Sequence, residues 1–170
     1  VTAGESHFDF ECKGIAFAGD AGQAYYVPVT SVNDLIAFRE IFGSERITKC
    51  GHNIKTVVLA LKKAGMEMNG PLFDSMLAHY LIEPEASHDL GIICGQYLNY
   101  QLMSESAEEV KKACEEADVV LQLRSRLTKE LEVRKHSLLL RDVEMPLVQV
   151  LAAMEFEGVT LDEEALKWMS

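Results

Sequence analysis

The pattern of apolar residues changes once along the chain, and this change limits the folds that the chain can adopt. Short β-prone runs separated by turn-rich segments dominate the first third, whereas from Phe73 onward apolar residues recur at helical spacing. The runs at residues 14–19 and 24–29, separated by DAGQ, predict a β-hairpin. HFDFEC at residues 7–12 is a candidate third strand. Strands followed by packed helices predict an α/β or α+β domain with a small mixed sheet.

Two helices are predicted among or directly after the strands. Ser31 is the expected N-cap of a helix over residues 31–42. Asn53 is the expected N-cap of a helix over residues 54–64, which follows a short strand that ends at Gly51.

The remaining helices are predicted from their apolar faces. They are expected over residues 73–83, 88–98, 104–135, 138–158 and from 160 onward. Ser104 or Ser106 should cap the long helix, and Gly158 should end the one after it. Thr160 or Asp162 should begin the last helix.

Composition excludes several classes of function. The net charge of −11 and the pI near 4.9 disfavour tight, autonomous DNA binding, which needs clustered Lys and Arg. The four cysteines are scattered without a C-x-x-C pair, so we expect buried free thiols and no zinc site. No apolar run is long enough to span a bilayer, and no secretory signal is visible, so we expect a cytoplasmic protein. The start at Val1 and not at Met is expected of a fragment, of a trimmed sequence or of a sequence with missing residues.

Several stretches resemble one family. These are GIAFA with AYYVPV, the segment from GHNIK to SHDL (residues 51–90), CEEADVVLQL (residues 114–123) and DVEMPLVQVLAAMEFEGVTLD (residues 142–162). They resemble the 3′–5′ proofreading exonuclease domain of bacterial family A DNA polymerases, the DNA polymerase I type, and the helix that joins it to the polymerase domain. The resemblance implies an RNase H-like mixed sheet flanked by helices. It also implies an exonuclease-like domain at residues 1–135 and connecting helices at residues 136–170 that lead into a polymerase domain beyond this sequence.

The resemblance identifies the positions at which the chemistry of the family would reside. An active member holds two divalent metals with four carboxylates, and a tyrosine orients the attacking water. Val57 stands where the family pattern G-Q-N-x-K-Y-D has its Asp. Lys112 stands at the tyrosine of the pattern Y-x-x-x-D, and Glu116 at its Asp. Asp74 and Asp118 match scaffold residues outside the metal set, and we expect Asp74 to be a helix N-cap or hydrogen-bond partner.

The first family motif, D-x-E, has two interpretations here. Asp9 and Glu11 have its spacing, which places both carboxylates on one face of a strand. Only Cys12 and Lys13 separate them from the next strand, where the family has a longer loop. Either the hairpin is cut to a two-residue turn, or this segment leads into the second strand and the true first strand is absent. We favour the second interpretation.

These departures predict a vestigial exonuclease domain that supports a DNA polymerase and binds no metal cofactor. Its expected partners are the polymerase domain of the same polypeptide and, weakly through the parent enzyme, DNA. We expect a monomer with no membrane partner. The alternative is a residual nuclease that uses Asp9, Glu11 and Glu116 with Mg²⁺ or Mn²⁺. A third hypothesis is a binding module that uses the long charged helix. Separately, we expect His79 and His88 to be core or surface residues and not ligands.

Overall fold

The computed structural model describes residues 12–104 and 106–158. The predicted hairpin is present: β1 (Gly14–Asp20) pairs antiparallel with β2 (Gln23–Pro28), from Gly14 opposite Pro28 to Asp20 opposite Gln23. Gly22, in the turn, has a φ of 79°, a backbone conformation that glycine adopts without steric cost. The candidate strand in HFDFEC and the helix expected from residue 160 lie outside the described residues, apart from Cys12.

The helix expected over residues 31–42 is interrupted. It forms α1 (Val32–Ile36) and α2 (Arg39–Phe42). Ser31 is the N-cap of α1, as predicted, and the structure adds a capping box with Asp34. At the interruption the ring of Phe38 stacks on Phe17 of β1, with 4.9 Å between centroids. This contact ties the helical segment to the hairpin.

A strand–helix–strand unit follows. It consists of β3 (Lys49–Gly51), α3 (Ile54–Lys63) and β4 (Leu72–Asp74), with β3 and β4 paired in parallel. The prediction of helix at Phe73 and Asp74 was wrong, because these two residues pair with Cys50 and Gly51 of β3. The described strands therefore form two two-stranded sheets, one antiparallel and one parallel.

The C-terminal half is helical, as predicted. It contains α4 (Ser75–Ile82), α5 (Leu90–Leu98), α6 (Glu109–Val133), α7 (Ser137–Leu139), the π-helical turn η1 (Leu140–Glu144) and α8 (Met145–Glu157). Gly158 ends α8 with a φ of 70°, and Pro146 lies in its first turn, where the missing N–H costs no intrahelical bond.

The predicted start of α6 was wrong. Its N-cap is Glu108, and not Ser104 or Ser106. The hydroxyl groups of these two serines bond to each other at 2.9 Å. The preceding loop is held instead by Glu115, whose carboxylate accepts the N–H of Met103 at 2.9 Å.

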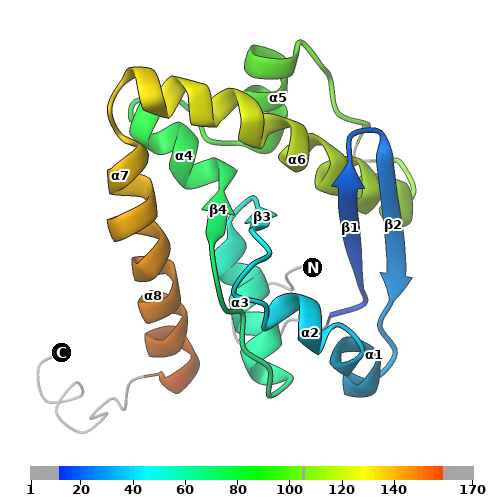
Figure 1. Ribbon diagram of the computed structural model, residues 1–170. Helices are drawn as coiled ribbons and strands as arrows, with labels where there is room; N and C mark the ends of the chain where they lie inside the picture. The colour runs from blue at the N-terminus through cyan, green and yellow to red at the C-terminus, as the bar shows by residue number, and fades with distance from the viewer. Residues whose placement is uncertain (1–11, 105, 159–170) are drawn as a thin grey trace, which may run out of the picture.

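Helix α6 joins the two halves of the domain. It crosses the hairpin and β3, and it also packs on α4 and α5 (Figure 1). Its buried side chains, Val119, Val120, Leu123, Leu127 and Leu131, recur at helical spacing and supply one side of the core. On the other side of the β3–β4 pair, α3 packs against α8. No helix of the described residues is long and apolar enough to cross a membrane.

Candidate functional site

The first predicted site position lies in the opening turn of α3. Val57 is half-buried and packs against the hydrophobic core, beside the buried Ile54, Val58 and Leu61 of the same helix. The side chain is entirely hydrocarbon. It therefore offers no lone pair to a metal ion, and its packing stabilises the helix as any partly buried valine would.

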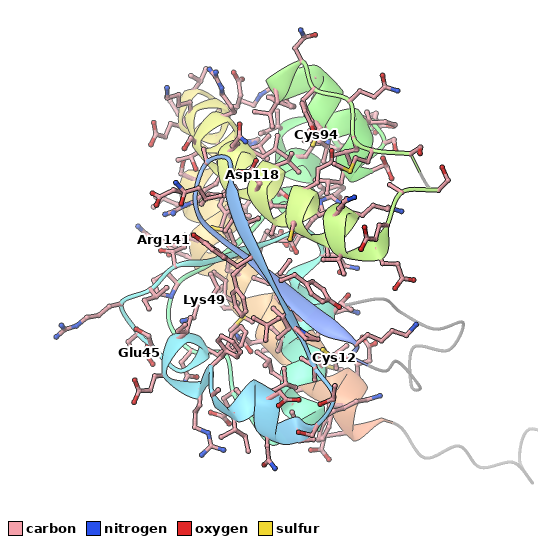
Figure 2. The ribbon with its side chains drawn as sticks, turned by 90° about the vertical axis from the view of Figure 1, so that its right-hand side faces the viewer. Cys12, Glu45, Lys49, Cys94, Asp118 and Arg141 are labelled. Atoms are coloured by element: carbon pink, nitrogen blue, oxygen red, sulfur yellow. The ribbon has the colours of Figure 1, made fainter. Side chains whose placement is uncertain are left out.

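The other described site positions lie on α6. Lys112 and Glu116 are four residues apart, so their side chains project from the same side of this helix; Lys112 is half-buried and Glu116 is exposed. Two residues further on, Asp118 accepts the N–H of Gly22 at 2.7 Å and the amide of Gln122 at 2.9 Å. Figure 2 shows Asp118 beside the turn of the hairpin. Asp118 is thus a scaffold residue, as predicted.

The carboxylates of the first motif, Asp9 and Glu11, lie outside the described residues. Between residues 12 and 158, with residue 105 excepted, no three His, Cys, Asp or Glu side chains gather into a group that could hold a metal ion. The four cysteines are free thiols, as expected, but only Cys94 is buried; Cys12, Cys50 and Cys114 are half-buried, so the expected burial was wrong for these three.

Asp74, at the end of β4, organises the start of two helices. Its buried carboxylate accepts N–H groups from Asn53 at 3.1 Å and Ile54 at 2.7 Å, at the start of α3. It also accepts the N–H groups of Met76 at 2.9 Å and Leu77 at 3.4 Å, at the start of α4. The expected capping role of Asp74 is therefore present and extends to a second helix.

The predicted cap of α3 differs in its chemistry. Asn53 occupies the N-cap position, but its backbone is left-handed, with a φ of 54°, and its side chain makes no capping hydrogen bond. The carboxylate of Asp74, from the adjacent strand β4, accepts the backbone N–H groups of Asn53 and Ile54 instead. Burial raises the pKa of the Asp74 carboxyl group, and the hydrogen bonds from Ile54, Met76 and Asn53 oppose that shift.

A polar cluster adjoins this double cap and was not predicted from the sequence. His52 Nδ1 lies 3.0 Å from Ser75 Oγ, and that hydroxyl group donates to Gly51 O at 3.2 Å. Further along, His79 is a buried core residue, in line with the expectation, and its Nδ1 lies 2.9 Å from Nδ1 of His88. Burial lowers the pKa of both His52 and His79.

The hairpin, the β3–α3–β4 unit and the crossing helix α6 define the class: a domain of the ribonuclease H-like fold. Brucella melitensis NrnC shares this fold, with a TM-score of 0.68 and 18% identity over 81% of this chain and 72% of that one. The family described as DNA polymerase I, ribonuclease H-like domain, matches residues 2–111. The chain belongs to this family, the 3′–5′ exonuclease domain of bacterial DNA polymerase I.

Individual relatives agree. DNA polymerase I of Bacillus subtilis is 29% identical over 98% of this chain and 20% of its own length. The Geobacillus stearothermophilus enzyme is also 29% identical, over 98% of this chain and 20% of its own length. A solved structure described as the POL domain of Pol1 from M. smegmatis, in complex with DNA primer-template and dNTP, has a TM-score of 0.79 at 27% identity. It covers 90% of this chain and 27% of that chain. The chain thus spans about a fifth of the curated relatives that it matches.

Proposed function

We propose that this chain is the exonuclease-like domain of a DNA polymerase I polypeptide, that it has lost 3′–5′ nuclease chemistry, and that it supports the polymerase domain. The observation that carries the proposal is Val57. It occupies the position that the family resemblance assigns to a metal-binding carboxylate, and its side chain packs against the core.

The chemistry of the remaining donors supports the same conclusion. A two-metal site neutralises the attacking and leaving oxygens with ions that are held by several carboxylates. Of the three described positions that the resemblance assigns to the site, only Glu116 has a carboxylate; Val57 has no donor atom, and Lys112 has an ammonium group that repels cations. This donor set does not fit a pair of divalent metals.

The organisation of the longer protein follows from the same proposal. Residues 1–135 form the exonuclease-like domain, and residues 136–170 connect it to the polymerase domain. The end of α6 at Val133 and the left-handed backbone of Lys135, with a φ of 61°, support a boundary here. The partners proposed are the polymerase domain of the same polypeptide and, weakly through the parent enzyme, DNA, in a monomeric cytoplasmic protein.

A nuclease assay tests the proposal directly. The chain would be incubated with a 5′-labelled single-stranded oligonucleotide and either Mg²⁺ or Mn²⁺, next to its Glu116→Gln variant. We expect no metal-dependent shortening of the oligonucleotide by either protein. Cleavage by the unaltered chain that disappears in Glu116→Gln would contradict the proposal and support the alternative nuclease that uses Asp9, Glu11 and Glu116. Equal cleavage by both preparations would indicate a contaminating enzyme, which a further chromatographic step removes before the assay is repeated.

A further inference from the structure

Helix α8 is apolar on two opposite sides. Met145, Val148 and Ala152 are buried against the rest of the domain. Between residues 145 and 154, Gln149 is the single polar side chain, and no side chain is charged. A helix with apolar residues all round is typical of the interior of a larger protein and not of a surface.

The outward side of this helical segment forms one continuous apolar stripe. Its members are Val143 (50% exposed), Leu147 (42%), Val150 (53%), Leu151 (43%) and Met154 (63%). Their spacing of three or four residues places them on one side, opposite the buried residues. We call these five residues, Val143 at the end of η1 and the other four in α8, the outer face of α8. Figure 1 shows α8 at the edge of the molecule, beside α3, with none of the other described elements on its outward side.

Polar contacts to α3 and the segment after it fix how α8 is rotated. Lys55 Nζ of α3 lies 2.5 Å from Glu155 Oε2 of α8, and both side chains are partly shielded from solvent. One turn and a half earlier, the side-chain amide of Gln149 donates to Met68 O at 2.8 Å. These two contacts, on the side of α8 that faces the domain, hold the outer face toward solvent.

We propose that the outer face of α8 is the docking surface for the polymerase domain of the same polypeptide, and that the Lys55–Glu155 ion pair is the contact that positions it. The inference rests on the proposed function, since it names the surface through which the support is given. Lys55 and Val57 lie on the same helix, so the helix that has lost its proposed metal ligand still orients the connection to the next domain.

The size of the stripe and the length of the relatives favour this occupant over a second copy of the chain. A stable interface between separate chains buries about 800 Å² and roughly 20–30 residues on each partner, whereas the outer face of α8 consists of five side chains. A domain in the same polypeptide needs less, because the covalent connection raises its effective concentration. The M. smegmatis chain, of which the matched region is 27%, shows that a relative of this domain occurs in a much longer polypeptide with bound primer-template.

The test is hydrogen exchange of residues 145–157 in the polypeptide that includes the polymerase domain. Val150→Lys should speed exchange in this segment at least about tenfold, because burial of a valine side chain is lost and a charge is placed at the contact. The matched control is Val133→Lys at the end of α6, where the valine is 79% exposed. It should leave exchange in residues 145–157 unchanged. Val150→Thr, which keeps the shape, should give an intermediate effect.

The ion pair is tested in the same polypeptide by charge reversal. Lys55→Glu alone and Glu155→Lys alone should each speed exchange of the segment, and the double exchange of charges should restore it. If either single substitution acted by disturbing local packing and not by breaking the ion pair, the double variant would not restore slow exchange.

Two outcomes would overturn the inference. One is exchange in Val150→Lys equal to that in Val133→Lys. The other is a dimer of the unaltered polypeptide in sedimentation that Val150→Lys converts to a monomer, since the outer face would then bind a second copy. The nuclease assay is independent of both: metal-dependent cleavage would refute the loss of activity and leave the docking result standing.

Discussion

Asp74 gives the sharpest quantitative prediction, because one carboxylate serves two helices. Asp74→Ala removes the acceptor for four N–H groups, two at the start of α3 and two at the start of α4. The residue is 1% exposed, so water cannot readily replace the carboxylate. The substitution therefore acts on the entrances of both helices at once.

The size of the effect follows from known capping energies. Loss of a single N-cap costs about 0.5–2 kcal/mol, and buried amides left without an acceptor add to that cost. For two helices we expect the free energy of unfolding to fall by about 2–4 kcal/mol. In a domain of this length each kcal/mol lowers the melting temperature by about 2–4 °C, so the expected shift is roughly 5–15 °C.

Urea unfolding followed by circular dichroism would measure the change. The matched control is Asp89→Ala, since Asp89 is an exposed N-cap that accepts N–H groups from one helix only, at Gly91 and Ile92. It should cost about 0.5–1 kcal/mol. If Asp74→Ala cost no more than Asp89→Ala, the double cap would not be the source of stability that the geometry indicates.

Three further changes have defined outcomes. Burial and His88 lower the pKa of His79 below 6.5, so just below pH 6.5 the unfolded chain binds more protons than the folded chain. The free energy of unfolding should therefore fall as the pH falls in this range. His79→Phe should reduce this dependence on pH, measured by urea unfolding at several pH values. Asp118→Ala should cost about 0.5–1.5 kcal/mol and speed amide exchange in the hairpin turn. Gly70→Ala should lower the melting temperature by several degrees, because Gly70 has a φ of 78° and the added Cβ would lie 2.5 Å from a backbone oxygen. Gly19→Ala is the control: its Cβ would meet no atom within 4 Å, and the substitution should have little effect.

The parts of the fold that were predictable are those set by local pattern. The hairpin follows from two β-prone runs around a turn, and α3 and α5 follow from apolar spacing with polar residues before them. The strand β4 was missed because its three residues, Leu72–Asp74, continue directly into α4 and carry apolar residues at positions compatible with either structure. Its strand conformation comes from pairing with β3, more than 20 residues earlier, which no local pattern records.

The candidate site was predictable only where the resemblance supplied positions. Motif resemblance identifies the positions of Val57, Lys112 and Glu116, and the identities of Val57 and Lys112 alone show that two of these positions lack a carboxylate. The double cap at Asp74 was half predicted, because FDS before a helix signals an N-cap for α4, whereas its bonds to α3 depend on β3 and β4 being adjacent. The His79–His88 pair gave no signal beyond two histidines flanking the turn at Pro84, since the approach of their rings is a result of tertiary packing.

The replacement at Val57 has a consequence for stability as well as for chemistry. Carboxylates gathered for metal binding repel one another when no metal is present, and a half-buried carboxylate also loses hydration, so an active site of this kind destabilises its own fold. Val57→Asp should therefore lower the free energy of unfolding in the presence of a chelator by about 1–3 kcal/mol. Val57→Asn, of equal size and without charge, should cost less. Recovery of the loss on addition of Mn²⁺, and only in Val57→Asp, would mean that the site retains a metal-binding frame, because an ion that binds the folded state stabilises it by mass action. Equal stability of the two variants in chelator would refute the argument that the valine relieves an electrostatic cost.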